Sequence, residues 1–260
     1  MIRLAIQSKG RLNEESLRLL KESGIDVDDT KRKFIGKASD FPLELLYLRD
    51  DDIPGVVADG AADLGVVGLN EVAETGADVK VIRRLGFGRC RLSLAIPKNV
   101  DYPGLSWFQG RSIATSYPSI LGSFLSGKGI SAEIREIKGS VEIAPAAGIA
   151  DAIFDIVSSG GTLVSNGLKE VESVLESEAV LVCGKDISDE KREILDSVLF
   201  RFDAVRESRG KKYILMNIPT ERVGEAMGLL PSMRSPTVMP LALEGWSSIH
   251  SVVDDSQLWR

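Results

Sequence analysis

The stretch "DIVSSGGTL", residues 155–163, places an acid, hydroxyls and glycines at the end of an apolar run. We expect a strand that ends at Val157, then a loop, then a helix that begins at Thr162. A strand–loop–helix junction of this composition directs backbone N–H groups and hydroxyls at one point, where an anion binds favourably. The same residues also suit an ordinary capped helix after a tight turn, so the rest of the chain must decide.

Three carboxylates precede this loop, namely Glu142, Asp151 and Asp155. Because side chains alternate along a strand, Asp151 and Asp155 are expected to face the same way. Buried carboxylates need hydrogen-bond partners, and the hydroxyls of a sugar beside a phosphate loop would supply them. The pattern therefore predicts a site for a phosphorylated ribose.

Basic residues follow two other expected strands. In "QSKGRL", residues 7–12, Lys9 and Arg11 flank Gly10 directly after the strand 2–6, and Arg49 leaves the end of the strand 43–49. Ligands of open α/β sheets bind beyond the carboxyl ends of the strands, which favours anion binding over the alternative of exposed basic turns. The small residues of "GAADLGVVGLNEV", residues 60–72, fit either close approach of a ligand or tight strand–helix packing.

Strands and helices alternate through the first 180 residues or so, which predicts parallel sheets covered by helices on both faces. A long helix over 186–206 and a basic turn at 207–212 precede a short C-terminal segment. We expect further strands at 64–68, 79–84, 91–97, 111–115, 132–138, 152–157, 213–218, 236–241 and 248–253, and helices at 13–24, 118–127 and 220–230.

Composition excludes several classes of protein. The 260 residues suit two or three domains, and a net charge of -6 argues against a surface that coats nucleic acid. The single histidine, His250, excludes a multi-histidine metal site and leaves no histidine base near the motifs. Cys90 and Cys183 form no CxxC pair, so we expect reduced thiols. We find neither a signal peptide nor a membrane span, and expect a cytoplasmic protein.

Taken together, "KGRL", "RDDDIP", "DLGVVG", "RLSLAIP", "IATSYP", the block at 139–172 and "LLPSMRSPTVMPLALEGW" resemble the ATP phosphoribosyltransferase family from residue 2 to the end. The resemblance implies transfer of a 5-phosphoribosyl group from phosphoribosyl pyrophosphate to N1 of ATP, with Mg²⁺, in the first step of histidine biosynthesis. It also implies an α/β fold of two periplasmic-binding-protein-like domains plus a small C-terminal ferredoxin-like α+β domain. We expect 1–92 with 184–206 to form the first catalytic domain, 93–183 the second, and 207–260 the regulatory domain.

The resemblance also implies roles for individual residues. The loop would hold the 5-phosphate, through Ser158, Ser159, Gly160, Gly161 and Thr162. Asp155, Asp151 and Glu142 would hold the ribose hydroxyls, with Asp155 and Asp151 also candidates for the metal. The pyrophosphate would face Lys9, Gly10, Arg11 and Arg49, and the nucleotide would face Asn70 and Leu12.

The regulatory segment ends at "DDSQLWR", before the second helix and last strand of a βαββαβ module, so we expect an incomplete domain. Family members with this domain are dimers or hexamers inhibited by histidine, and the effector candidates here are Asn217, Thr237 and Leu241. Two other interpretations stay open at this stage. One is a non-catalytic two-domain binding protein for a phosphorylated ligand, and the other is a regulatory homologue with a vestigial cleft.

Overall fold

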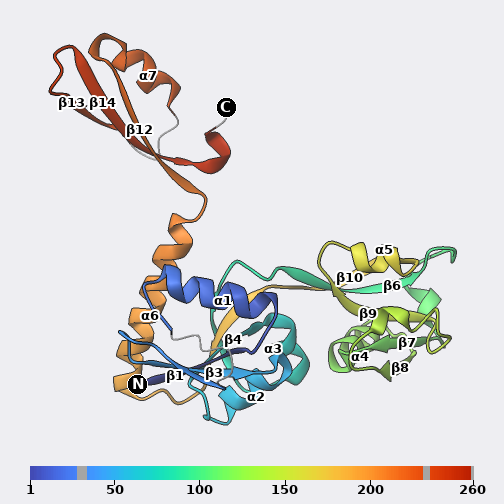
Figure 1. The fold of residues 1–260 in the computed structure, drawn as a ribbon. Helices are drawn as coiled ribbons and strands as arrows, with labels where there is room; N and C mark the ends of the chain where they lie inside the picture. Colours follow the sequence, from blue (N-terminus) through green and yellow to red (C-terminus); the bar gives the residue numbers. More distant parts are fainter. Residues whose placement is uncertain (28–33, 231–234, 259–260) are drawn as a thin grey trace. The chain divides into compact units, whose positions relative to one another are not determined.

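A computed structural model describes residues 1–27, 34–230 and 235–258 of the chain. The chain divides into two compact units, Met1–Asp203 and Ala204–Arg260 (Figure 1). The first unit contains two sheets, and the second contains one small sheet of its own. No helix in the described ranges is both long enough and apolar enough to cross a membrane.

The first sheet of unit one has six strands in the order β2-β3-β1-β4-β11-β5. Its centre is parallel, because β1 (Ile2–Gln7) pairs with both β3 (Leu43–Leu48) and β4 (Leu64–Gly68) in that sense. The antiparallel additions are β2 (Ile35–Lys37), paired with β3, and β11 (Ala179–Cys183), which pairs with β4 and with β5 (Lys80–Arg84). The helices of this part are α1 (Arg11–Glu22), α2 (Ile53–Ala58), which follows the short 3-10 turn η1 (Asp50–Asp52), and α3 (Leu69–Thr75).

The second sheet has five strands in the order β10-β6-β9-β7-β8. Here β7 (Ser112–Thr115) pairs in parallel with β8 (Glu133–Glu136) and β9 (Ala152–Val157). Two antiparallel strands complete the sheet, β6 (Cys90–Pro97) and β10 (Leu168–Ser177). Its helical elements are η2 (Leu105–Phe108), α4 (Pro118–Gly127), η3 (Val141–Ile143) and α5 (Gly161–Ser165).

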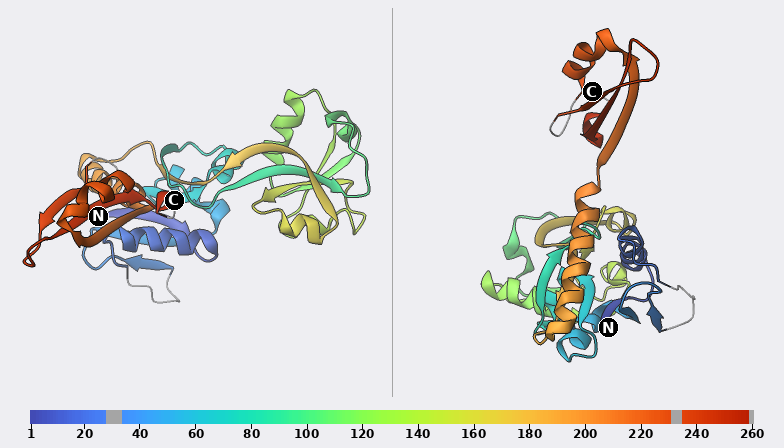
Figure 2. Two further views of the ribbon diagram at one scale, coloured as in Figure 1. Left: turned by 90° about the horizontal axis from the view of Figure 1, so that it is seen from above. Right: turned by 90° about the vertical axis from the view of Figure 1, so that its left-hand side faces the viewer.

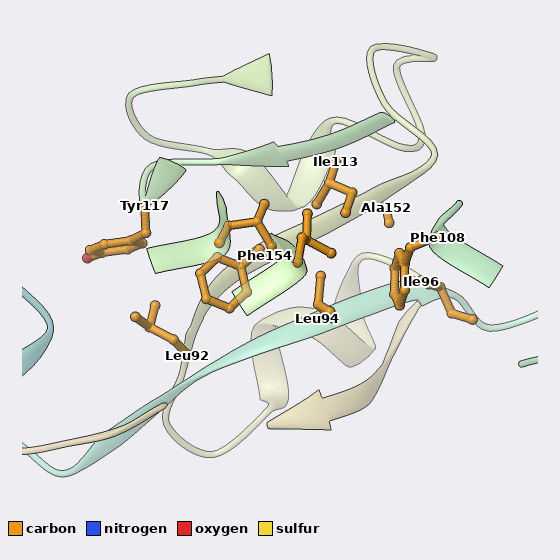
Figure 3. Packing of buried hydrophobic residues seen from close by; sticks show 10 residues of the cluster. Leu92, Leu94, Ile96, Phe108, Ile113, Tyr117, Ala152 and Phe154 are labelled. Carbon is orange, nitrogen blue, oxygen red and sulfur yellow. The ribbon is translucent and has the colours of Figure 1, made fainter. Parts of the chain in front are cut away.

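The core of the second sheet is a layer of fully buried aliphatic and aromatic side chains (Figure 3). Leu92 and Leu94 of β6 pack with Phe154 of β9, Ile113 of β7 and Phe108 of η2. Burying such side chains contributes about 1.5–3 kcal/mol each relative to leaving them exposed. This layer holds β9 and β7 rigidly, and the residues that follow these two strands belong to the candidate site.

In the second unit, β12 (Lys211–Pro219), β14 (Trp246–Asp254) and β13 (Thr237–Pro240) form an antiparallel sheet in the order β12-β14-β13. The chain reaches it through α6 (Asp189–Ser208), and the helical elements here are η4 (Thr220–Arg222), α7 (Val223–Leu229) and η5 (Asp255–Gln257). Figure 2 shows α7 beside this sheet. Alternate side chains of β14, including Ile249 and Val253, are buried, so one face of the sheet is covered.

The α/β architecture and the small C-terminal α+β domain confirm the predicted fold class. The prediction of parallel sheets holds for the centre of each sheet but not throughout, because β2, β6, β10 and β11 run antiparallel to their neighbours. The expected domain boundary at residue 183 also differs from the pairing. Strand β11 joins the first sheet rather than the second, although only Glu178 separates it from β10. The two compact units likewise meet after Asp203, whereas a boundary after residue 206 was expected. Both positions lie within α6, so no break in the helix marks the boundary.

Candidate functional site

Two groups of strands in the first unit end in polar loops. Because β1, β3 and β4 are parallel, their carboxyl ends lie at one edge of the first sheet. The same holds for β7, β8 and β9 in the second sheet. Ligands of open α/β sheets bind at such edges. The catalytic and substrate-binding residues selected from the sequence follow one of these six strands, except Asp155, which lies on β9, and Asp151, which precedes it.

The loop from Ser158 to Gly160 joins β9 to α5, as the sequence predicted. Gly160 has a φ of 79°, a left-handed conformation that glycine adopts without steric cost. The side chains of Ser158, Ser159 and Thr162 are exposed. The N–H groups of the first turn of α5 have no partner inside the helix, so they are available to an anion together with the hydroxyls.

Asp155 and Glu142 lie close together beside this loop. Asp155 is on β9 and accepts a hydrogen bond from the backbone N–H of Ile156 at 2.8 Å. Burial raises the pKa of Asp155 to about 6, against the lowering effect of that hydrogen bond and with a further rise from the negative charge of Glu142. Glu142 lies on η3 and is half-buried. The two carboxylates therefore place negative charge near the carboxyl end of β9, where the loop at 158–160 begins.

Asp151 is not part of this pair. It precedes β9, and its Oδ2 accepts hydrogen bonds from the backbone N–H and the hydroxyl of Ser112, both at 2.8 Å. These two bonds lower the pKa of Asp151. Four residues of extended chain, about 13 Å, separate it from Asp155. An even spacing along the strand therefore did not bring the two carboxylates to one site. Asp151 instead links the amino ends of the parallel strands β7 and β9, away from the loops that follow them.

The basic loop after β1 is open to solvent. Lys9, Gly10 and Arg11 are exposed, and Gly10 has a φ of 91°. Neither Lys9 nor Arg11 forms a hydrogen bond or ion pair through its side chain with any residue in the described part of the chain. Leu12, half-buried in the first turn of α1, lies against Gly88. Two cations without protein partners at a strand end suit an anionic ligand.

A pocket of about 400 Å³ lies where β3 and β4 of the first sheet approach β7 and β8 of the second. Its lining residues are Arg49, Asp50, Asp51, Glu71, Ser116, Tyr117, Lys138 and Gly139. Only Arg49 among them was selected from the sequence. The strings "RDDDIP" and "IATSYP" contained others, but a run of aspartates is indistinguishable from a solvated loop until its burial is known.

A buried polar network closes one side of this pocket. Glu71 Oε1 accepts hydrogen bonds from the Tyr117 hydroxyl at 2.9 Å and from Asn70 Nδ2 at 2.8 Å. Asn70 in turn accepts a hydrogen bond from the Ser177 hydroxyl at 2.7 Å, and its backbone N–H donates to that hydroxyl at 3.1 Å. Asn70 is only 3% exposed. Its side chain is thus engaged within the protein, which does not favour the expected role in facing the nucleotide.

Burial raises the pKa of Asp50 to about 7, with further rises from the negative charges of Glu71 and Asp51. Burial also raises the pKa of Glu71, against the lowering effect of its hydrogen bond from Tyr117. Carboxyl groups with raised pKa values are common in functional sites, where activity is favoured over stability. The pocket is therefore a candidate part of the functional site.

The shifted pKa of Asp50 gives a pH-dependent prediction. An acid with a raised pKa in the folded state stabilises the fold below its unfolded pKa near 3.8, and this contribution is lost as pH rises towards 7. The free energy of unfolding of Asp50→Asn should therefore exceed that of the wild type. This difference should grow by on the order of 2–3 kcal/mol between pH 5 and pH 8. Urea unfolding at both pH values measures this gap. Asp52→Asn, an exposed neighbour, should show no such growth, and an equal gap at both pH values for Asp50→Asn would contradict the shift.

Comparison with known proteins defines first a fold and then a family. A substrate-binding protein of an amino acid ABC transporter aligns with a TM-score of 0.52 over 80% of this chain and 93% of its own, at 11% identity. The first unit thus has a periplasmic-binding-protein-like fold. An ATP phosphoribosyl transferase (HisG:HisZ) complex from Thermotoga maritima aligns with a TM-score of 0.70 and 29% identity, over 80% of this chain and 99% of its own.

Sequence relatives agree with the second comparison. The family profile of ATP phosphoribosyltransferase matches residues 49–204, and the profile "HisG, C-terminal domain" matches 208–260. An ATP phosphoribosyltransferase of Phocaeicola vulgatus is 61% identical over all of this chain and 92% of its own length. That of Cytophaga hutchinsonii is 52% identical over all of this chain and 91% of its own. The chain belongs to the ATP phosphoribosyltransferase family, and it is a pentosyltransferase of histidine biosynthesis.

Proposed function

We propose that the strand ends of the first unit bind phosphoribosyl pyrophosphate and ATP and transfer the 5-phosphoribosyl group to N1 of the adenine, releasing pyrophosphate. The observation that carries this assignment is that acidic and basic side chains follow different strands. Acids and a hydroxyl- and glycine-rich loop follow β9, whereas unpaired cations follow β1. A sugar carrying a monophosphate at one end and a diphosphate at the other matches this division.

The acids suit the sugar. Departure of pyrophosphate leaves positive charge on the ribose ring, and the carboxylates of Asp155 and Glu142 would stabilise it while accepting hydrogen bonds from the hydroxyls. The loop at 158–162 would hold the 5-phosphate and so fix the ring relative to these acids. We assign Asp151 only a structural role at the start of β9, since its carboxylate already accepts two hydrogen bonds from Ser112.

The cations suit the leaving group. Lys9 and Arg11, beside the open backbone of Gly10, would bind the diphosphate and stabilise the charge that it gains. Arg49 would assist from the end of β3, where its guanidinium lies 3.2 Å from Asp51 Oδ1. We place Leu12 near the nucleotide because it lies in the first turn of α1, next to these cations.

The attacking group needs no base in the protein. N1 of adenine carries a free lone pair, so no proton must leave before attack. The only histidine of the chain, His250, lies on β14 in the second unit, where it contacts the Tyr213 and Ser248 hydroxyls. Position and charge can therefore supply the catalysis without a histidine.

The donor set beside the loop fits Mg²⁺. Mg²⁺ in phosphoryl sites takes one or two protein carboxylates, and substrate phosphates complete its shell. Asp155 and Glu142 form such a pair, whereas Asp151, before the start of β9, is too far from Asp155 to join them. No cluster of three or more acids, histidines or cysteines suited to a metal occurs in the described ranges. When bound, Mg²⁺ would neutralise charge on the pyrophosphate; the protein's own groups would orient the sugar.

We expect Arg11→Ala and Asp155→Ala each to lower kcat/KM at least about 100-fold, because each removes charge that stabilises the transition state. Adduct formation from ATP and phosphoribosyl pyrophosphate, followed by absorbance with pyrophosphatase present, measures the effect. Lys21→Ala removes another exposed cation of α1 and should retain wild-type kinetics. If Arg11→Ala or Asp155→Ala keeps wild-type kinetics, that residue's role is wrong; if wild-type protein binds both substrates without forming the adduct, it is a binding protein.

Removal of metal tests the Mg²⁺ proposal. We expect EDTA to abolish adduct formation and added Mg²⁺ to restore it, because the two carboxylates need a cation to approach a diphosphate. The apparent Mg²⁺ requirement should rise in Glu142→Gln and stay unchanged in Asp151→Asn. Full activity in EDTA would contradict the proposal.

We further propose that the second unit binds histidine as an inhibitor. Asn217 pairs with Ser248 and Thr237 pairs with His250, so both candidates lie on one face of the sheet, on either side of β14. Leu241 follows β13, and its backbone N–H donates to the backbone carbonyl oxygen of Trp246. Saturating histidine should lower turnover of the wild type, with weaker inhibition of Asn217→Ala. Unchanged wild-type turnover would contradict this proposal.

We also propose that the chain self-associates into a dimer or hexamer.

A further inference from the structure

Asp50 is the one acid of the pocket at β3, β4, β7 and β8 that has no hydrogen-bond partner in the described structure. Its Oδ1 is shielded from solvent and accepts no hydrogen bond. Glu71, by contrast, is satisfied by Tyr117 and Asn70. A buried carboxylate oxygen without a donor costs several kcal/mol in a typical protein, so such an atom calls for an explanation.

The neighbouring charges do not relieve Asp50. The guanidinium of Arg49 is directed to Asp51, with Nε and Nη2 at 3.2 and 3.3 Å from its two oxygens. Lys138, another lining residue of the pocket, has its Nζ 4.0 Å from Glu136 Oε1. The nearest carboxylates, Glu71 and Asp51, add further negative charge. Asp50 therefore has neither a hydrogen-bond donor nor a counter-ion among the residues that the structure describes.

This environment selects the chemistry of the group that would face Asp50. A diphosphate carries only acceptors and negative charge, so it would be repelled. A group with N–H donors that gains positive charge during the reaction would be favoured, and more so in the transition state than in the ground state. A pocket of about 400 Å³ also has room for a purine base.

The acceptor substrate has one such group. When N1 of adenine attacks C1′ of the ribose, the N1–C1′ bond forms and the C1′–O bond to pyrophosphate breaks, with its electron pair leaving on pyrophosphate. The adenine then carries a positive charge shared over N1, C6 and the 6-amino nitrogen. The amino hydrogens stay in place, and their strength as hydrogen-bond donors rises.

We propose that Asp50 recognises the 6-amino group of the nucleotide base, accepting a hydrogen bond from N6–H that strengthens as N1 takes up the phosphoribosyl group. This inference rests on the proposed transfer to ATP. It makes Asp50 both a determinant of base specificity and a catalytic residue. It also accounts for the missing partner, because the substrate itself supplies the donor.

The test compares wild type, Asp50→Asn and Asp52→Asn. Asn keeps the shape of Asp but removes the charge, and Asp52 is an exposed neighbour in the same run of aspartates. Equilibrium binding of ATP and of inosine triphosphate, which carries a carbonyl oxygen at C6, measures recognition of the amino group. Kinetics with phosphoribosyl pyrophosphate measure its effect on the transition state.

We expect the wild type to favour ATP over inosine triphosphate by about 10-fold or more, since a hydrogen bond to a charged group is lost. In Asp50→Asn this preference should fall to about threefold or less, because the amide can also donate to the carbonyl oxygen. Its kcat for ATP should fall about 100-fold while KM for phosphoribosyl pyrophosphate stays within about threefold. Asp52→Asn should match the wild type in all of these.

The inference is overturned if Asp50→Asn, shown to be folded by its thermal unfolding, keeps the wild-type ratio of affinities and the wild-type kcat. Failure of the proposed function has a different signature, namely no adduct from the wild type with ATP and phosphoribosyl pyrophosphate. The binding ratios of the variants still decide the role of Asp50 in that case, since they need no turnover.

Discussion

The hydrogen bonds that converge on Glu71 are the interaction on which the first unit depends. This carboxylate is only 7% exposed, and it would be costly to bury without the donors that Tyr117 and Asn70 supply. Tyr117 follows β7 in the second sheet, whereas Asn70 and Glu71 belong to α3 after β4 of the first. One buried acid thus links the two sheets at the carboxyl ends of their parallel strands. Ser177 of β10 belongs to the same network, because its hydroxyl donates a hydrogen bond to Asn70.

A second contact from α3 reinforces this connection. The carboxylate of Glu74 accepts hydrogen bonds from the backbone N–H groups of Ser119 and Ile120, at 2.8 and 3.0 Å, in the first turn of α4. The positive end of a helix favours a negative charge at this place. Both acids lie on one face of α3, three residues apart, so a single short helix aligns the carboxyl ends of β4 and β7. The pocket lined by Asp50 exists because these two ends are held near each other.

The proposed chemistry uses the charges that this arrangement leaves unpaired. Most charged side chains at strand ends are satisfied within the protein, as Asp151 is by Ser112 and Arg49 is by Asp51. Lys9, Arg11, Asp50 and Glu142 are among the exceptions within the described part of the chain, since no hydrogen bond or ion pair engages their side chains there. Transfer of a phosphoribosyl group separates charge, with a negative leaving group and a positive sugar and base. Groups without protein partners are the ones that can respond to that separation.

The sequence by itself determined the elements whose signals are local. The glycine- and hydroxyl-rich stretch after Val157, the basic turn around Gly10 and the apolar runs predicted two polar loops at strand ends and the α/β class. These signals are local, because turn chemistry and side-chain periodicity act over a few residues. The family resemblance followed from the order of those motifs. Strand β10 escaped prediction because the apolar residues of "LKEVESVLES", namely Leu168, Val171, Val174 and Leu175, recur at three- to four-residue spacing as on a helix. Its extended conformation depends on irregular pairing with a distant strand.

Only the tertiary structure decided which charges meet. Asp151 and Asp155 share a strand face yet lie about 13 Å apart, whereas Glu142, far from Asp155 along the chain, is its neighbour. Asn70 was expected to face the nucleotide but is buried in the network around Glu71, and Asp50 was one aspartate of three until its burial was known. Burial, register and the approach of two sheets arise from contacts between distant segments, and no short-range pattern in the sequence records them.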